Sequence, residues 1–496
     1  MPKPPDRSLA AEASSSLLAI VCVAAITLLA MLIRLYRLDA QGITLDEGFS
    51  IFLAKAPFAE FARTLWRSEL NMAPYYLLLR GWIHFGHGEW IIRLLGVALS
   101  TATVPVVYGL GHRLFNARTG MVAAALLALQ PYHVELARNA RSSPLVVLLV
   151  CLASLCFLQG LKNPTRLIWA AYALLSAAAV YSHFFALLVI VAQWASLLFL
   201  RRVEIPRKHI LYALALLIVL LLPWAIFMLT SDGTTRLSWV QPLNAQQLRW
   251  LLSSLTLSRG RSLVYVVLWC IAAWSAARAS NATERWPFWF VFLWLFVPVL
   301  LTVTASLYQP LLVERFLAIC LPASVLLAAV GLVELASNSR VCAVVVCALL
   351  IVYSASAIRF RARHEEFDEG WRRSSQLVLQ NLNAGDVVIA EGMKGMAFDY
   401  YRAEAEAPLP AFQRLDSLSS PLPSPPPVNV WILGWTRPAP SAPGTAPRSD
   451  DAMVQVFAQA HRNEYCWVAP ISDAGVTRVW HFRRCPAGDP ASSSAR

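Results

Sequence analysis

The chain's first apolar run, SSLLAIVCVAAITLLAMLIR at residues 15–34, decides the class of fold. It follows a short basic N-terminus, is too long for a signal-peptide core and lacks a small-residue cleavage site, so it is an uncleaved transmembrane helix. The same composition continues along the chain: of 496 residues, 57% are hydrophobic and only 14% are charged, and the mean hydropathy is +0.54. These values lie outside the range of soluble domains. The sequence therefore predicts an integral membrane protein.

Further apolar runs are long enough to span about 30 Å of hydrocarbon. With the first run they predict about eleven crossings. The further runs lie near residues 90–111, 119–133, 143–160, 167–182, 184–200, 208–229, 262–278, 286–307, 315–336 and 340–358.

A shorter apolar run, Pro74–Gly88, is interrupted by Arg80 and two histidines. Cytoplasmic loops carry an excess of Lys and Arg, and the basic residues between the runs share one side only if residues 35–118 cross the membrane once. We therefore expect the run to lie along the outer interface as an amphipathic helix, with Tyr75, Tyr76 and Trp82 at the level of the headgroups. The same parity places the C-terminal region outside.

The hydropathy of the sequence falls beyond Ile358, which predicts that the chain forms two structural units. Residues 1–358 form the predicted membrane domain, with an outer loop at 35–89, and residues 359–496 form an extracytoplasmic domain. Alternation of helix-like and strand-like segments predicts an α/β domain. The segments are a helix at Glu369–Leu382, strands at Val387–Ala390, Val428–Leu433 and Val476–Phe482, and Pro-rich loops at Pro421–Pro427 and Pro438–Pro447.

The net charge of +13 comes from Lys and Arg scattered between apolar runs, without a basic stripe, which favours membrane topology over nucleic-acid binding. Seven of the nine cysteines lie in apolar runs, where a thiol acts as a small hydrophobe. Cys466 and Cys485 lie in the polar C-terminal region and would pair in an oxidising compartment. The sequence leaves that pairing open.

The outer loops carry the candidate chemistry. Asp46 and Glu47 follow the first crossing, and an ionisable residue beside the bilayer is a default functional candidate, although a solvated acidic loop has the same pattern. Arg138, Arg141 and Arg315 run against the positive-inside tendency and suit phosphate oxygens, or they extend to lipid headgroups. Other polar loop residues are Glu69, Asn71, Tyr75, Tyr76, Arg80, Asn139, His183, Trp239, Tyr308 and Glu314.

An ordered set of short motifs resembles the GT-C glycosyltransferases, and within them the branch of dolichyl-phosphate-mannose protein mannosyltransferases and the lipid A aminoarabinose transferase. Each motif is loose, and their order over roughly residues 30–400 makes the resemblance specific. The motifs are Leu45-Asp46-Glu47-Gly48-Phe49-Ser50, Asn71–Leu79, Arg93-Leu94-Leu95, Tyr108–Phe115, Pro131-Tyr132-His133, Arg138–Arg141, Ser182–Phe185, Glu314–Leu317, Leu321–Ala323, Gly370–Arg372 and Gly385–Val388.

The resemblance implies a fold, a reaction and roles for the loop residues. The fold is a polytopic α-helical membrane protein with a small extracytoplasmic α/β domain, and the reaction is an inverting sugar transfer from a polyprenyl-phosphate donor at the outer face. Asp46 matches the family's catalytic carboxylate and would act as the general base or orient the acceptor, with Glu47 as its supporting neighbour. Arg138, Arg141 and Arg315 would bind the donor phosphate. Glu69, Asn71, Tyr75, Tyr76, Asn139 and His183 would shape the substrate cavity.

Two departures from the family pattern bear on the chemistry. The family often has an acidic residue where this chain has Asn139, and its double proline is replaced by Met72-Ala73, with Pro74 one place later. The first change leaves open a metal-independent enzyme, an altered acceptor, or another residue such as Glu135 supplying the charge. No cofactor is certain from the sequence, and a divalent metal ion remains open.

The expected partners are a polyprenyl-phosphate sugar, the membrane, and a lipid, glycan or protein acceptor, with no nucleic acid. The Ala- and Arg-rich, Lys-poor composition points to a bacterial source and so to the cytoplasmic (inner) membrane. Other functions remain as alternatives: a lipid-linked sugar flippase or transporter, a polysaccharide ligase or polymerase, or a non-catalytic relative. A transporter predicts broken helices at the midplane and inverted repeats, whereas here the polar groups gather in loops on one face.

Overall fold

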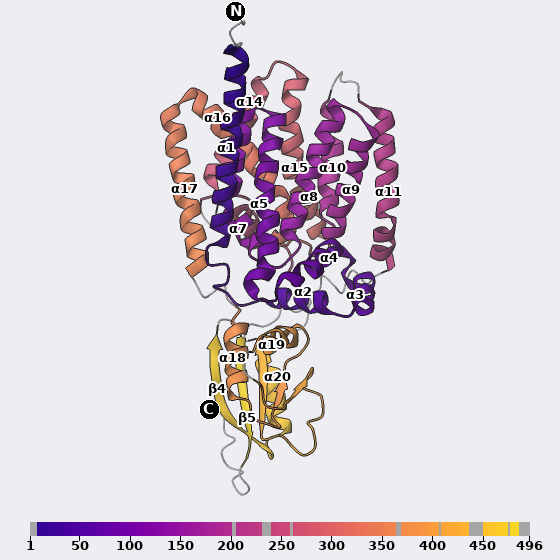
Figure 1. Cartoon of the computed structure of the whole chain (residues 1–496), viewed down its shortest axis with the longest axis vertical. Coiled ribbons are helices and arrows are strands. Elements are labelled where there is room, and N and C mark those ends of the chain that lie inside the picture. The colour runs from indigo at the N-terminus through magenta and orange to yellow at the C-terminus, as the bar shows by residue number, and fades with distance from the viewer. Residues whose placement is uncertain are drawn as a thin grey trace, which may run out of the picture.

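The computed structural model describes residues 7–200, 205–230, 240–257, 261–363, 369–405, 408–435, 450–474 and 477–485. Figure 1 shows a bundle of roughly parallel helices with the chain's N-terminus at one end and a small sheet domain at the other. Trp239 and the Pro-rich segment Pro438–Pro447 lie outside the described residues.

Each predicted crossing corresponds to an apolar helix of the bundle. Within the described ranges, seven helical spans are long and apolar enough to cross a membrane, and four shorter apolar helices accompany them. The prediction of about eleven crossings therefore agrees with the helix count. The helices are α1 (Arg7–Leu35), α5 (Glu89–Leu114), α6 (Ala117–Leu129), α8 (Ser143–Lys162), α9 (Arg166–Ser182), α10 (Ala186–Ser196), α11 (Arg207–Thr230), α14 (Leu263–Arg278), α15 (Ala282–Ser306), α16 (Leu321–Asn338) and α17 (Arg340–Arg363).

Side-chain caps set where several of these helices begin. The side chains of Asn116, Thr165 and Asn281 accept hydrogen bonds from backbone N–H groups in the first turns of α6, α9 and α15. Such caps satisfy N–H groups that have no partner within the helix, at a point where the apolar run alone would leave the boundary undefined.

Between α1 and α5 the chain forms short helices at one end of the bundle instead of a further crossing. They are α2 (Leu45–Lys55), α3 (Phe58–Thr64) and α4 (Ala73–Trp82), and in Figure 1 they lie beside the sheet domain. At about 1.5 Å per residue, the ten residues of α4 extend only about 15 Å, half the hydrocarbon thickness. Among the described residues, α4 belongs neither to the long apolar helices nor to the shorter ones, and the placement of Pro74–Gly88 along the outer interface stays a prediction.

The predicted position of Tyr75 and Tyr76 at the headgroups is wrong. Both side chains are completely buried, whereas Leu77 and Leu78 on the opposite face of α4 are exposed. Because α4 packs against α2, α5 and α9, its tyrosines turn into the protein. Trp82 is partly buried and donates its indole N–H to the Ile91 carbonyl.

The C-terminal part is a five-stranded mixed sheet with the order β2-β1-β3-β5-β4. β1 pairs in parallel with β2 and β3, and β5 lies antiparallel between β3 and β4. The strands are β1 (Val387–Ile389), β2 (Gln413–Leu415), β3 (Asn429–Trp435), β4 (Tyr465–Ala474) and β5 (Thr477–Arg484). The helices are α18 (Trp371–Asn381), α19 (Met393–Ala403) and α20 (Asp450–Ala460). Thus the sheet domain and its predicted first helix and strands are present.

A disulfide joins Cys466 of β4 to Cys485, just beyond β5. It closes the end of the β4–β5 hairpin and answers the question that the sequence left open. The predicted division of the chain after residue 358 falls within α17, and as a domain boundary it stays a prediction.

Candidate active site

Asp46 lies in the first turn of α2, at the end of the bundle next to the sheet domain. Thr44 caps this helix: its hydroxyl accepts from the Glu47 N–H while the Glu47 carboxylate accepts from the Thr44 N–H, a reciprocal capping box. The Asp46 side chain is therefore presented by a helix start with a fixed geometry. It keeps 33% of its surface exposed, so a substrate has access to it.

Two arginines from distant parts of the sequence converge on Asp46. Arg315 Nη1 lies 2.7 Å from Asp46 Oδ2, and Arg141 Nη2 lies 3.7 Å from the same oxygen. Arg315 belongs to the 3-10 helix η5 (Glu314–Cys320), and Arg141 to the loop between α7 (Pro131–Ala137) and α8. The cluster of Asp46, Arg141 and Arg315 is hereafter the Asp46 cluster.

The pKa of Asp46 reflects two opposing effects. Burial of the carboxyl raises its pKa, but the charges of Arg141 and Arg315, with the hydrogen bond from Arg315, outweigh burial and lower the pKa below its usual value. Asp46 is therefore ionised at neutral pH. The Asp46 cluster places two guanidinium groups beside one carboxylate, and Glu69 supplies a second negative charge that also acts on Arg141.

Glu47 points away from the Asp46 cluster into the protein. Its side chain is 1% exposed and forms a two-pronged ion pair with Arg93 of α5, at 2.9 Å from Nε and 2.8 Å from Nη2. The backbone N–H of Ala140 also donates to it at 2.9 Å. Although burial alone would raise the pKa of Glu47, Arg93 and these donors lower it. Glu47 thus connects α2, α5 and the loop that carries Arg141.

The buried tyrosines of α4 lie beside the Asp46 cluster. The Tyr76 hydroxyl donates to Glu69 at 3.4 Å, and burial raises the pKa of both Tyr75 and Tyr76, with Arg141 acting in the opposite direction. The Tyr75 hydroxyl has no hydrogen-bond partner among the described residues. It is a polar group that a substrate hydroxyl would satisfy.

His183 and Asn71 lie on the aromatic side of the site. The imidazole packs against Phe184 and Phe316, with ring centroids 5.2 and 4.6 Å away. Burial and the charges of Arg315 and Arg141 lower its pKa to about 3, so His183 is neutral. The Asn71 side-chain oxygen accepts from the Phe184 N–H at 2.8 Å and so joins the segment before α4 to the α9–α10 loop.

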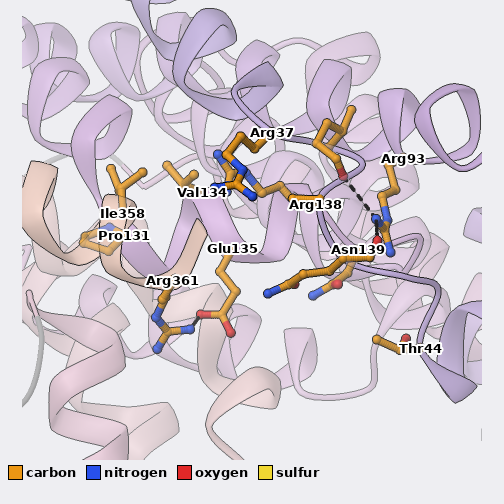
Figure 2. Close-up of a pocket in the computed structure, with 13 residues that line it drawn as sticks. Arg37, Thr44, Arg93, Pro131, Val134, Glu135, Arg138, Asn139, Ile358 and Arg361 are labelled. Atoms are coloured by element: carbon orange, nitrogen blue, oxygen red, sulfur yellow. Dashed lines mark hydrogen bonds and ion pairs between the residues drawn. The ribbon is translucent and has the colours of Figure 1, made fainter. Parts of the chain in front are cut away.

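Arg138 and Asn139 are not part of the Asp46 cluster. Arg138 donates to three backbone carbonyls at the end of α1, those of Ile33, Arg34 and Tyr36. Both residues line a separate pocket, shown in Figure 2, which also includes Thr44 and Arg93. The structure therefore brings together eight of the eleven predicted site residues around Asp46 and places Glu47, Arg138 and Asn139 outside this group. The eight are Asp46, Glu69, Asn71, Tyr75, Tyr76, Arg141, His183 and Arg315.

A metal ion does not fit the Asp46 cluster on its donor set. Asp46 already pairs with two guanidinium groups, and its arginine neighbours cannot act as ligands. In the described part of the chain, no three or more His, Cys, Asp or Glu side chains are placed so that together they could bind a metal ion.

Residues of the sheet domain form hydrogen bonds with the loop that leads into α2. The Leu45 N–H donates to Glu369 Oε2 at 2.9 Å, and the Ile43 N–H donates to the Tyr401 hydroxyl at 2.8 Å. Arg372 forms an ion pair with Glu89 and donates to the carbonyls of Asp39 and Gln41. These residues position the backbone of the loop that precedes Asp46. Only Arg372 lay within a motif noted in the sequence, because contacts across more than three hundred residues have no local pattern.

Glu369 makes this contact sensitive to pH. Burial raises the pKa of its carboxyl from 4.5 to about 7, although the Leu45 N–H and the Trp371 indole N–H lower it. A carboxyl whose pKa is higher in the folded protein binds more protons when folded, so its contribution to stability falls as pH rises from about 4.5 to about 7. We expect Glu369→Gln to remove this slope from the thermal unfolding midpoint of the purified protein. Glu404→Gln, at an exposed site, is the control, and an unchanged slope in Glu369→Gln would refute the assignment.

Comparisons with known proteins agree with this architecture. The model of the family described as dolichyl-phosphate-mannose-protein mannosyltransferase matches residues 72–227. The crystal structure of ArnT from Cupriavidus metallidurans bound to undecaprenyl phosphate superposes with a TM-score of 0.60 at 11% sequence identity, covering 92% of this chain and 97% of that chain. The chain has the fold of the GT-C superfamily.

A second GT-C structure extends the comparison. The archaeal oligosaccharyltransferase AglB from Archaeoglobus fulgidus, in complex with an inhibitory peptide and a dolichol-phosphate, has a TM-score of 0.51 at 10% identity. The match covers 78% of this chain and 64% of AglB. Among curated proteins no sequence match is found. The GT-C fold and the apolar helices together make this chain a multi-pass membrane protein.

Proposed function

We propose that this GT-C protein is a glycosyltransferase that moves a sugar from a polyprenyl-phosphate donor to an acceptor at the outer face of a bacterial cytoplasmic membrane. The observation that carries the proposal is the Asp46 cluster, a partly exposed carboxylate 2.7 Å from one guanidinium and 3.7 Å from another at the end of the helical bundle. Its two guanidinium groups suit the oxygens of a phosphate, and its carboxylate suits an acceptor hydroxyl.

The comparisons support the donor class. Both ArnT and AglB have been seen with a polyprenyl or dolichol phosphate, and the matched family model is named for a dolichyl-phosphate-linked sugar. The Asp46 cluster lies beside the segment from α2 to α4. In this segment Trp66, between α3 and α4, and Leu77 and Leu78 of α4 are exposed, as expected for groups at a membrane surface. A donor whose phosphate lies at this depth would keep its prenyl chain in the bilayer.

The reaction requires one bond to form and one to break. The acceptor oxygen attacks the anomeric carbon on the face opposite the phosphate, and the bond from that carbon to the phosphate oxygen breaks with its electron pair remaining on the phosphate. Asp46 takes the acceptor proton, while Arg141 and Arg315 stabilise the charge that develops on the leaving phosphate. The attack inverts the configuration at the anomeric carbon and releases polyprenyl phosphate.

Donor binding would also make Asp46 a better base. In the structure described here both arginines lower the pKa of Asp46. When a donor phosphate draws the guanidinium groups toward itself, the carboxylate loses part of that stabilisation and its pKa rises toward the usual value. The same two arginines thus bind the leaving group and tune the base.

Replacing Arg315 by glutamine tests this arrangement. We expect kcat/KM for transfer from a radiolabelled polyprenyl-phosphate sugar to fall by about a hundredfold, the loss typical of removing a donor that stabilises transition-state charge. Because Asp46 loses a cation, the acidic limb of the pH–rate profile should also move to higher pH. Arg63→Gln, on the exposed face of α3, is the matched control. An Arg315→Gln enzyme with an unshifted acidic limb would separate Arg315 from Asp46 and contradict the mechanism.

A further inference from the structure

The pocket that contains Arg138 is distinct from the Asp46 cluster and has a composition of its own. It has a volume of about 190 Å³ and lies between the end of α1, α7 and the last turn of α17. Arg93 lines this pocket, whereas Asp46 does not. Arg93 also pairs with Glu47 at the start of α2, so this buried ion pair lies between the pocket and the Asp46 cluster. Four of its lining residues are arginines, against one carboxylate: Arg37, Arg93, Arg138, Arg361 and Glu135.

Two of these arginines are neutralised within the protein. Arg93 pairs with Glu47, and Arg361 pairs with Glu135, whose carboxylate faces the guanidinium in Figure 2. Arg37 and Arg138 have no carboxylate partner among the described residues. The pocket therefore keeps two positive charges, which matches the charge of a phosphate monoester.

Arg138 is held in place by hydrogen bonds to the backbone, and part of its guanidinium group can still donate hydrogen bonds to a ligand. Its Nε and Nη2 bond the carbonyls at the end of α1, at distances between 2.7 and 3.3 Å, while Nη1 makes no hydrogen bond to the described residues. Burial and the charge of Arg93 lower the pKa of Arg138 to about 10, so it is charged at neutral pH in an unfavourable surrounding. A bound anion would offset that cost.

The position of the pocket indicates how a ligand reaches it. Arg37 lies two residues beyond the end of α1, and Ile358 and Arg361 lie in the last turns of α17. The pocket therefore lies beside the ends of two apolar helices that are largely unburied by the rest of the protein. Tyr36 and Phe360, next in sequence to the lining residues, are 44% and 50% exposed. Pro131, Val134 and Ile358 supply an apolar wall. A headgroup phosphate with its chains in the bilayer fits this arrangement.

We propose that the pocket lined by Arg37, Arg138 and Arg361 is a second anion site, which binds the phosphate group of a membrane lipid separately from the donor. Arg37 and Arg138 bind the phosphate oxygens, and Arg361, paired with Glu135, borders the site from α17. The site does not depend on the proposed sugar transfer, because Asp46 takes no part in it.

The test measures lipid binding to the full chain in nanodiscs. The nanodiscs contain phosphatidylcholine with a minor fraction of fluorescent phosphatidic acid, and the variants are Arg37→Asn/Arg138→Gln and Arg37→Asn alone. Arg37 has a positive φ of 55°, which asparagine tolerates, and its side chain forms no hydrogen bond or ion pair with the described residues. The control Arg63→Gln/Arg359→Gln removes the same charge from exposed positions outside the pocket.

We expect the double variant to bind phosphatidic acid at least about tenfold more weakly than wild type, the effect of losing a charge-assisted hydrogen bond. The affinity of the single variant should lie between those of wild type and the double variant. The control should bind like wild type. Equal binding by wild type, pocket variants and control would overturn the proposal. So would displacement of the label by inorganic phosphate at equal concentration, because the site would then serve a soluble anion.

Discussion

Asp46→Asn is expected to lower the rate of sugar transfer by about 10²- to 10⁴-fold, the range that a positioned general base contributes. Asparagine keeps the shape of the side chain and can still accept a hydrogen bond from Arg315, so the fold and donor binding should persist. What the variant loses is the negative charge that takes the acceptor proton. The measurement is transfer from a radiolabelled polyprenyl-phosphate sugar in membranes, with expression matched by immunoblot.

The matched control for Asp46 is Asp39→Asn. Asp39 is an exposed carboxylate in the same loop, and it contributes only its backbone carbonyl to the contact with Arg372. It should keep full activity. If Asp46→Asn and Asp39→Asn transfer sugar equally well, Asp46 is not the base.

The second large effect is on stability and concerns the buried pair of Glu47 and Arg93. Glu47→Ala leaves the Arg93 guanidinium buried without its counter-charge and removes the acceptor for the N–H groups of Thr44 and Ala140. Breaking a buried ion pair in this way costs about 3–5 kcal/mol. We expect a clear fall in the thermal unfolding midpoint of the purified protein, with lost activity as a consequence.

Two further variants distinguish the cost of leaving Arg93 buried without its counter-charge from the effect of removing any carboxylate. Glu60→Ala removes an exposed carboxylate from α3 and should leave the midpoint unchanged. The double variant Glu47→Met/Arg93→Met removes both charges together and should recover part of the lost stability, since an apolar pair carries no desolvation cost. A Glu47→Ala protein as stable as wild type would show that the pair does not hold α2 in place.

The membrane architecture could be predicted from the sequence because it depends on local composition. Apolar runs of spanning length mark each helix, and the Lys and Arg between them exclude the run at Pro74–Gly88 as a crossing. The strand at Val387–Ala390 and the helix at Glu369–Leu382 also carry local patterns, and both elements are present within about two residues of their predicted ends.

The geometry of the site could be predicted only in part. Order along the chain connected Asp46 with Arg315, and the two side chains lie 2.7 Å apart. Sequence could not separate Arg141 from Arg138, three residues earlier, because the loop after α7 turns one toward Asp46 and the other toward the end of α1.

The burial of particular side chains at the site could also not be predicted from local sequence patterns. Tyr75 and Tyr76 have the amphipathic character of interfacial residues, yet packing of α4 against its neighbours buries them. Likewise, Glu47 has the same local sequence whether it is solvated or paired, and only the approach of Arg93 from α5 decides between these states.

The most direct test of sugar transfer is whether the bond between sugar and phosphate breaks. Purified protein in proteoliposomes would receive a polyprenyl-phosphate sugar labelled in the sugar, together with a lipid and protein extract as acceptor, and mass spectrometry would follow both parts of the donor. We predict that polyprenyl phosphate appears in amounts equal to the sugar transferred, and that both products form about 10²- to 10⁴-fold more slowly with Asp46→Asn. If the donor instead crosses the bilayer with its sugar still attached, the protein is a transporter and the account is wrong.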